Sequence, residues 1–246
     1  MKKNNKNWWW LEDHYWRADM GRVMDNHLKF IDRQKEETVS VFYGTSIKST
    51  DGVYHPTEGS STHFIGEALF RLIKPDTSLL EVGCGSGALS CIAAKLGASR
   101  VVATDISTLA YDCAQNNVKN LGLENKIEVL QSSLMDKVPD EKFDYIVFNP
   151  PLLHCEPMSN EKVDKKEYNE IAIDHNGTTT LDFINQAKPF LKKGGTLLLL
   201  TSNIGNRETI TQATEMLSEI GEVNAASALY RQSGAQWRFV LSVQAN

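Results

Sequence analysis

The chain lacks any apolar run long enough to span a bilayer, because none approaches the ~20 residues that a spanning helix needs. Three lysines near the N-terminus are followed by no apolar stretch, so the sequence predicts no secretory signal. The run Trp8–Trp10 is interrupted at once by Glu12, Asp13 and Arg17, which disfavours an anchor at a membrane surface. We therefore expect a cytoplasmic protein with no membrane partner.

Cysteine is scarce, and its spacing favours neither disulfides nor a metal site. The four cysteines form no Cys-x-x-Cys pair, and no cluster of cysteine and histidine has the spacing of a zinc site. Cys84 and Cys91 are expected to act as small buried apolar residues. The sequence thus predicts free thiols in a reducing cytosol and no bound metal.

A surplus of basic residues is missing as well. The chain has 26 Lys and Arg against 31 Asp and Glu, which gives a formal net charge of -5. Proteins that bind nucleic acid mainly through its phosphates usually carry an excess of positive charge. A nucleic-acid partner is therefore disfavoured, although a local basic patch stays open. With 41% apolar residues among 246, the chain can bury one sizeable core.

From about residue 75 onward, short apolar stretches alternate with segments of helical periodicity. The sequence predicts strands at 78–82, 100–104, 126–130, 145–149 and 196–201, and helices at 87–96, 109–121, 181–191 and 207–220. The pair Gly194-Gly195 is expected to stop the third of these helices. Residues 225–230 and 237–243 flank a Gln-Ser-Gly turn and are predicted to pair as a hairpin. This order predicts an α/β fold with a Rossmann-like, doubly wound, seven-stranded sheet that ends in an antiparallel hairpin.

The first 40 residues differ from the rest. They are polar, yet they carry four of the five tryptophans, at positions 8, 9, 10 and 16. We expect three parts: an N-terminal arm over 1–40, a hairpin and helix over 41–74 that precede the core, and the core over 75–246. Two roles stay open for the arm, which either packs on the core for stability or forms a lid over the substrate.

A glycine turn follows the first strand of the core. The pattern Gly83-x-Gly85-x-x-Ala88 lets a backbone approach a nucleotide-like ligand, and Asp105 follows twenty residues after Gly85, where its carboxylate can accept both ribose hydroxyls. This spacing suits a nicotinamide dinucleotide as well as S-adenosylmethionine. Glu81 favours the second, because a pyrophosphate gains nothing from another negative charge whereas a sulfonium ligand with an ammonium group does. A plain tight turn is the remaining alternative.

The run Asn149-Pro150-Pro151 stands at the end of a later strand. Asn149 offers a side-chain carbonyl, Pro150 offers a backbone carbonyl, and Pro151 restricts Pro150 to an extended geometry. An amide or aryl amine is a poor nucleophile because its lone pair is conjugated. Two acceptors that draw on its N–H hydrogens help to free that pair and favour the charge that develops on nitrogen. The run therefore predicts a device for holding an NH2 group, with a plain turn as the alternative.

Together these motifs resemble the class I S-adenosylmethionine-dependent methyltransferases. The resemblance is to the HemK-like release-factor glutamine methyltransferases and the related methyltransferase-small family, which includes guanine and adenine RNA methyltransferases. Residues 52–58 with 62–64, and the glycine-containing turn at 176–183, match segments of that family outside the core motifs. The resemblance covers the chain from Val39 onward and leaves the tryptophan-rich arm unmatched.

The resemblance implies S-adenosyl-L-methionine as cofactor and a set of contacts to it. The methionine part would lie against Glu81, Gly83 and Gly85, and the ribose against Asp105. The adenine would meet Ile106 and Ser133, where Ser133 stands in place of the usual aspartate. Thr62 and Asn149 complete the expected cofactor site, and Asn149 and Pro150 are the expected catalytic residues.

One departure from the family bears on the substrate. Family members that act on planar groups usually carry an aromatic residue after Asn-Pro-Pro, where this chain has Leu152, so an RNA base would lose a stacking contact of ~1–3 kcal/mol. The expected substrate residues are Tyr54, Pro151, Leu152, His154 and Trp16. The arm is also too short and too polar to match the helical bundle with which glutamine-methylating members dock their protein.

We therefore expect an N-methyltransferase that acts on an amine, amidine or amide nitrogen of a small molecule. Methylation of a protein glutamine amide or of an exocyclic amine of an RNA base is the first alternative. A non-catalytic subunit with a methyltransferase fold and a nicotinamide oxidoreductase are the alternatives from other classes. The oligomeric state is not predicted.

Overall fold

The structure is a computed structural model that describes residues 8–33, 37–152, 178–230 and 234–246. Its centre is one seven-stranded sheet in the order β5-β4-β3-β6-β7-β9-β8. The strands are β3 (Ser78–Val82), β4 (Arg100–Asp105), β5 (Ile127–Gln131), β6 (Phe143–Phe148), β7 (Leu191–Ser202), β8 (Val223–Tyr230) and β9 (Gln236–Gln244). The first five strands of that order pair in parallel, and β9 is antiparallel to both β7 and β8. The predicted doubly wound sheet with its antiparallel hairpin is confirmed.

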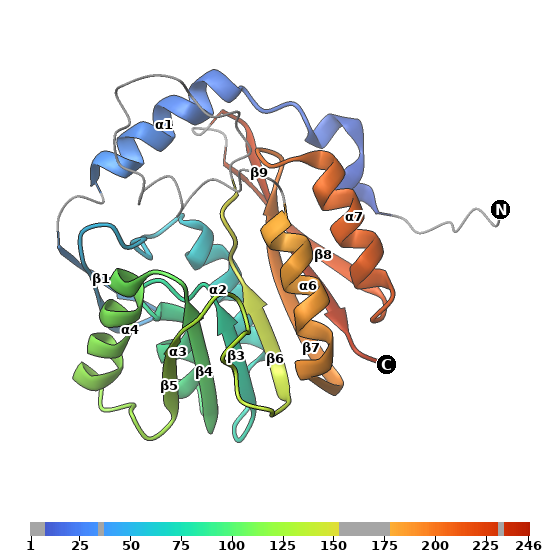
Figure 1. Cartoon of the computed structure of the whole chain (residues 1–246). Helices are drawn as coiled ribbons and strands as arrows, with labels where there is room; N and C mark the ends of the chain where they lie inside the picture. Colours follow the sequence, from blue (N-terminus) through green and yellow to red (C-terminus); the bar gives the residue numbers. More distant parts are fainter. Residues whose placement is uncertain (1–7, 34–36, 153–177, 231–233) are drawn as a thin grey trace.

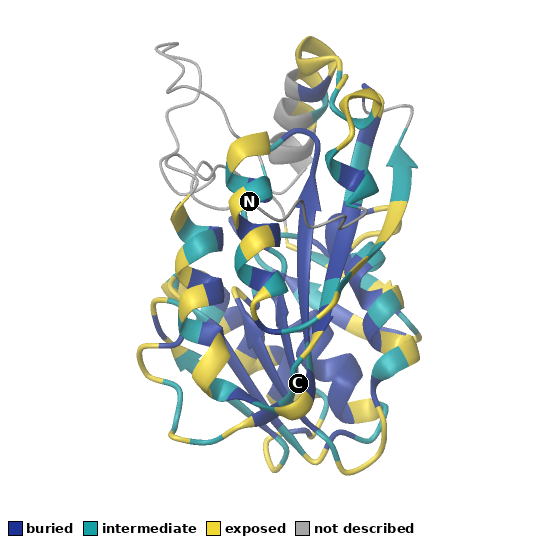
Figure 2. Ribbon diagram, turned by 90° about the vertical axis from the view of Figure 1, so that its right-hand side faces the viewer, coloured by how far each residue is buried: buried dark blue, intermediate teal, exposed yellow. Residues whose placement is uncertain are grey.

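Helices cover both faces of this sheet (Figure 1). They are α2 (Ser61–Leu72), α3 (Ala88–Lys95) and α4 (Thr108–Asn120) on one face, and α6 (Thr178–Phe190) and α7 (Arg207–Ser218) on the other. Because successive side chains of a strand point to opposite faces, Leu79 packs with the first group and Leu80 with the second. Figure 2 shows the result, with buried residues along the central strands and exposed residues on the outer sides of the helices.

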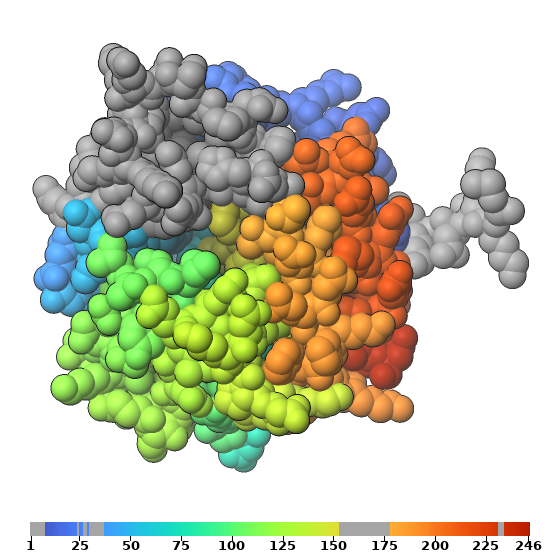
Figure 3. All heavy atoms as spheres, viewed as in Figure 1, coloured from blue at the N-terminus to red at the C-terminus, as the bar shows by residue number. Residues whose placement is uncertain are grey.

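Helix α6 contacts the loop that precedes β6. The backbone N–H of Met135 donates to the side-chain carbonyl of Gln186 at 3.2 Å, which ties the loop to the helix. Figure 3 shows these two segments side by side on the front face, the loop in yellow-green and the helix in orange.

Strand β7 begins earlier than the sequence predicts. It starts at Leu191, which pairs with Phe143, and a register shift follows before Tyr145 pairs with Thr196. Gly194 lies in this shift with a φ of +74°, a left-handed conformation that glycine adopts without strain. The glycine pair is therefore an irregularity inside a strand, whereas the helix before it already ends at Phe190.

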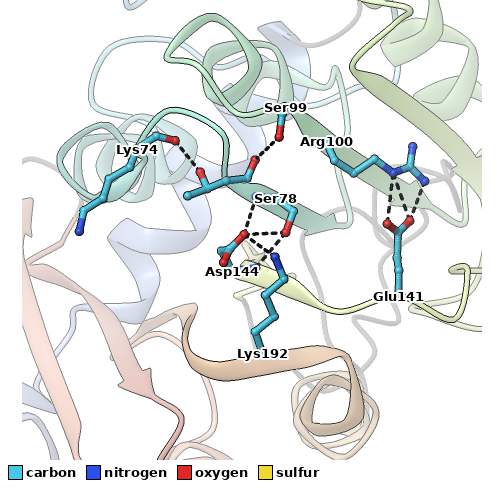
Figure 4. A network of polar contacts seen from close by, with 8 residues as sticks. Lys74, Ser78, Ser99, Arg100, Glu141, Asp144 and Lys192 are labelled. Carbon is cyan, nitrogen blue, oxygen red and sulfur yellow. Dashed lines mark hydrogen bonds and ion pairs between the residues drawn. The ribbon is translucent and has the colours of Figure 1, made fainter.

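Polar contacts join the beginnings of the parallel strands, at the edge of the sheet away from the ends of β3 and β6 (Figure 4). Asp144 of β6 accepts hydrogen bonds from the N–H and hydroxyl of Ser78 and from Lys192, each at 2.8 Å. Burial alone would raise the pKa of Asp144, but these donors outweigh it and hold the pKa below its ordinary value. Arg100 pairs with Glu141 in the same region. The end of the sheet where the strands begin is thus pinned by charged contacts.

The hairpin of β1 (Thr38–Phe42) and β2 (Thr45–Ser49) precedes the core and packs Phe42 and Ile47 into it. The arm before it contains the short helical turns η1 (Trp9–Leu11) and η2 (Asp13–Tyr15) and the helix α1 (Met20–Arg33). Trp10 is 2% exposed and donates from its indole N–H to Thr214 of α7 at 3.3 Å. The first half of the arm is therefore part of the packed core.

Helix α1 packs in a different place from the helical turns that precede it. It lies at the end of the sheet to which the parallel strands point (Figure 1), and the Asp19 N–H just before it donates to Gly234 at 2.9 Å. Its buried residue Val23 packs with Ile204, and Leu152 packs partly against this pair. The second half of the arm thus shares one small apolar cluster with the residue that follows Asn-Pro-Pro.

Within the described ranges, no helix has both the length and the apolar character needed to cross a membrane. The thiols of Cys84, Cys91 and Cys113 are free and buried, and Cys155 lies outside the described residues.

Candidate active site

The glycine turn connects β3 to α3 through three left-handed glycines. Gly83, Gly85 and Gly87 have φ values of +63°, +53° and +73°. A Cβ on Gly83 would lie 3.0 Å from the ring of Phe148, and one on Gly87 would lie 3.1 Å from the Cβ of Ala114. Apart from Gly85 itself and its two chain neighbours, no heavy atom in the part of the chain that the structure describes comes within 4 Å of the position of a Cβ on Gly85. The backbone of Gly85 is therefore open to a ligand on the side where other residues carry their side chain.

Asp105, the last residue of β4, reaches back to this turn. Its Oδ2 accepts from the N–H of Gly85 at 2.9 Å, and its Oδ1 accepts from the N–H of Ser107 at 3.0 Å. Burial raises the pKa of Asp105, and these backbone donors oppose the rise in part. One carboxylate thus holds the glycine turn at the place where the ribose is expected. The ribose contact itself stays a prediction.

The residues expected around the adenine lie beside Asp105. Ile106 follows it directly and is 70% exposed, so its side chain is accessible to a ligand at this corner. Ser133 is exposed and lies one residue past Ser132, whose N–H donates to the carbonyl of Asp105 at 2.8 Å. The structure therefore brings Ile106 and Ser133 to the same corner as Asp105. Their contacts to a cofactor stay predictions.

Glu81 lies in β3 and is 3% exposed. Its Oε2 accepts from the backbone N–H of Ser90 at 2.8 Å and also from the Ser90 hydroxyl. Burial raises its pKa to about 8, although both hydrogen bonds from Ser90 act to lower it. The carboxyl group therefore joins strand β3 to the first turn of α3, a structural task that comes in addition to the expected contact with the methionine part of the cofactor.

Asn149 follows β6 at the edge of the sheet where β3 ends. Val82 pairs with Phe148, so Asn149 stands beside Gly83 on the neighbouring strand. Its side-chain Nδ2 donates to the hydroxyls of Ser61 and Thr62, both at 3.2 Å. Its Oδ1 is buried and has no hydrogen-bond partner among the described residues. The two motifs found in the sequence therefore meet, and Asn149 presents an unused acceptor between them.

The other expected substrate residues lie in different parts of the molecule. Tyr54 contacts this cluster, because its hydroxyl accepts from the Ser61 hydroxyl at 3.2 Å. Pro151 and Leu152 are partly buried, and Leu152 packs against the cluster of Val23 and Ile204. Trp16 packs within the arm, where its indole N–H donates to the carbonyl of Trp10 at 3.0 Å. His154 lies outside the described residues.

Ser61 and Ser90 take part in the site, and reasoning from the sequence did not single them out. A signal for the first exists: Ser60 caps α2 by accepting from the N–H of His63 at 3.1 Å, and a capping serine places the next two residues in the first helical turn. Ser61 and Thr62 thus face Asn149 from a helix end. The partnership of Ser90 with Glu81 has no comparable sequence signal.

A doubly wound sheet, an open glycine turn held by an acidic residue and an Asn-Pro-Pro run beside it define a class I S-adenosylmethionine-dependent methyltransferase. The family model described as "Ribosomal protein L11 methyltransferase (PrmA)" matches residues 54–155. A relative from Methanocaldococcus jannaschii, named a protein N5-glutamine methyltransferase, is 37% identical over 176 residues, which cover 69% of this chain and 82% of the relative. The chain belongs to the HemK-like family of these methyltransferases.

Two further matches extend this comparison. The release factor glutamine methyltransferase of Rhodopirellula baltica is 38% identical over 119 residues, and this match covers 46% of the chain and only 40% of that protein. The solved structure of a Thermus thermophilus 16S rRNA N2 G1207 methyltransferase, in complex with S-adenosylmethionine and guanosine, has a TM-score of 0.60 at 19% identity. That structural match covers 86% of this chain and 50% of the other. It shows a shared fold.

The chain is an enzyme that uses S-adenosylmethionine, and the choice between this cofactor and a dinucleotide is settled in favour of the former. The residues fit such a ligand, since the Gly85 backbone is open and Asp105 lies against it. The expectation of a small-molecule amine or amide as partner is wrong. The acidic charge and the missing aromatic speak against a polyanion or a stacked base, but they do not distinguish a small molecule from a protein, and the relatives are named for protein glutamine and for ribosomal protein L11.

Proposed function

We propose that this enzyme methylates the amide nitrogen of a glutamine side chain in a protein. The observation that carries the proposal is the buried Oδ1 of Asn149, which has no partner within the described residues and stands next to the Pro150 carbonyl. A primary amide has two N–H hydrogens on one nitrogen, and two fixed acceptors suit it. The relatives named for glutamine methylation support the same substrate.

Bound S-adenosylmethionine supplies an electrophilic methyl group, and the residues of this chain hold the nitrogen that receives it. Asn149 Oδ1 and the Pro150 carbonyl accept the two N–H hydrogens of the amide. These contacts strengthen as nitrogen gains positive charge, so they stabilise the transition state more than the bound substrate. They also aim the nitrogen lone pair at the methyl carbon, and this orientation lowers the entropic part of the barrier.

Charge favours a protein over RNA as the substrate. The net charge of -5 gives the chain no general attraction to a polyanion. Leu152, in the position where members of the resembling family that act on planar groups usually carry an aromatic residue, offers no ring on which a base stacks.

The proposal is tested by offering the enzyme tritiated S-adenosylmethionine with a purified bacterial release factor, ribosomal protein L11 and ribosomal RNA in parallel. Label recovered as N5-methylglutamine after proteolysis of a protein supports the proposal. Label found only in RNA, or only on lysine or terminal amines of the proteins, overturns it.

Asn149→Ala should lower kcat by a hundredfold or more, about 3 kcal/mol in the barrier, while cofactor affinity changes much less. Calorimetry with S-adenosylhomocysteine measures that affinity. Asn116→Ala, which truncates an exposed asparagine on α4, is the matched control and should keep full activity. Equal losses of turnover and of cofactor affinity in the Asn149 variant would make Asn149 a cofactor ligand instead.

A further inference from the structure

The amide of Asn149 is held by the first turn of α2. The hydroxyl oxygens of Ser61 and Thr62 both lie 3.2 Å from Asn149 Nδ2. Both residues are buried, with exposed fractions of 5% and 9%. The two hydrogens of the NH2 group therefore have two acceptors on one helix, and the carbonyl end of the amide points away from that helix.

Tyr54 determines the direction of these hydrogen bonds. The Ser61 hydroxyl donates to the Tyr54 hydroxyl at 3.2 Å, and the Ser61 backbone N–H points to the same oxygen at 3.4 Å. A serine hydroxyl has a single proton. Because that proton is engaged with Tyr54, only lone pairs of Ser61 face Asn149, and they accept from NH2 but repel a carbonyl. A flip of the Asn149 amide is thereby disfavoured.

This arrangement leaves Oδ1 of Asn149 buried without a partner among the described residues, which is unfavourable in the isolated protein. The unfavourable orientation becomes useful when an acceptor brings an N–H to it. We propose that Ser61, with Tyr54 behind it, is a positioning residue that fixes the Asn149 carbonyl toward the acceptor nitrogen. The inference rests on the proposed function for the identity of the acceptor, but the orientation of Asn149 is testable without it.

Two substitutions remove different contacts of this arrangement. Ser61→Ala removes the acceptor that faces Asn149, and Tyr54→Phe removes only the hydroxyl that engages the Ser61 proton. Each should reduce kcat, Ser61→Ala about tenfold or more and Tyr54→Phe less, with KM for the acceptor and the Kd of S-adenosylhomocysteine within about twofold. In the double variant, Tyr54→Phe should have no further effect, because its influence passes through Ser61.

A matched control separates positioning from the general loss of a buried hydroxyl. Ser49→Ala in β2 removes a fully buried hydroxyl that has no partner in the described part of the chain, and it should keep full activity. Additive losses in the Tyr54 and Ser61 variants, or a Ser61→Ala enzyme with wild-type kcat, would overturn the proposal.

A second measurement needs no acceptor. In ¹⁵N-labelled enzyme the side-chain NH2 signals of Asn149, identified by their loss in Asn149→Asp, should show slow exchange with water. Both Ser61→Ala and Tyr54→Phe should shift these signals and speed the exchange. Unchanged Asn149 signals in both variants would overturn the positioning role. If the wild-type enzyme methylates no glutamine while these signals respond as expected, the proposed substrate fails and the positioning role stands.

Discussion

Glu81→Gln should make the stability of the enzyme less dependent on pH. The wild-type carboxyl group is buried between β3 and α3, and its pKa is raised to about 8 from an ordinary value of 4.5. Glutamine has nearly the same shape and can still accept from Ser90, but it does not ionise. The substitution therefore removes one titration and keeps the contact that joins strand to helix.

The sign and size follow from proton linkage. A pKa that is raised on folding means that the folded protein binds the proton more tightly than the unfolded chain. The contribution of Glu81 to stability is then fully present below pH 4.5 and is lost as the pH rises toward 8. Between pH 5 and 8 the wild-type free energy of unfolding should fall by about 3–4 kcal/mol relative to that of the variant.

Urea unfolding followed by tryptophan fluorescence at pH 5, 6, 7 and 8 measures this difference. The lowered pKa of Asp144 is common to the two proteins and cancels in the comparison, whereas the charge of Asp105 helps to raise the pKa of Glu81 and is part of the effect that the substitution removes. A pH-independent cost of packing the glutamine amide shifts the unfolding free energy of the variant by the same amount at every pH. It leaves the slope of that free energy against pH unchanged. Parallel stability curves for the two proteins would refute the reasoning.

Substitutions at two more residues test the site and the arm. Asp105→Ala should weaken S-adenosylhomocysteine binding by about 1.5–3 kcal/mol, because it removes the acceptor for the ribose and for the Gly85 N–H, and Asp105→Asn should lose less. Calorimetry measures both, and unchanged affinity in the alanine variant would refute Asp105 as the acceptor for the ribose. Trp10→Ala should cost about 3–5 kcal/mol of unfolding free energy, as expected for a fully buried tryptophan, while cofactor affinity at low temperature stays near that of the wild type. A small loss of stability together with a large loss of methylation would favour the lid over the packed arm.

Most of the core was predictable because its residues follow local rules. The strand at 78–82 is the same in prediction and structure, since it is a short apolar run bounded by a glycine turn. The meeting of Gly83 and Asn149 was also predictable, because neighbouring parallel strands bring their carboxyl ends to one edge of the sheet. Strand β7 was harder, because pairing with Phe143 through an irregular register overrides the tendency of Gly194 to end an element.

The details of the site depend on contacts between distant segments. The orientation of Asn149 is decided by Ser61, 88 positions away, and by the Tyr54 hydroxyl behind it. The number of tryptophans predicted that the arm packs on something. It did not reveal that Trp10 would reach Thr214 or that α1 would lie near Leu152. No periodicity within one segment encodes such pairings.

The packing of Trp10 against α7 has a consequence for how the chain folds. Trp10 and Thr214 are 204 positions apart, and Trp9 also lies against Phe239 of β9. On the ribosome, the arm emerges long before the helix and strand that receive it. Its tryptophans must stay exposed until almost the whole domain has been synthesised, which is the period when such surfaces attract other nascent chains. Contacts of this span also slow folding. The arm therefore docks on α7 and β9 only after these elements have been synthesised. We expect the dependence on chaperones during synthesis to increase with the number of aromatic residues in the arm.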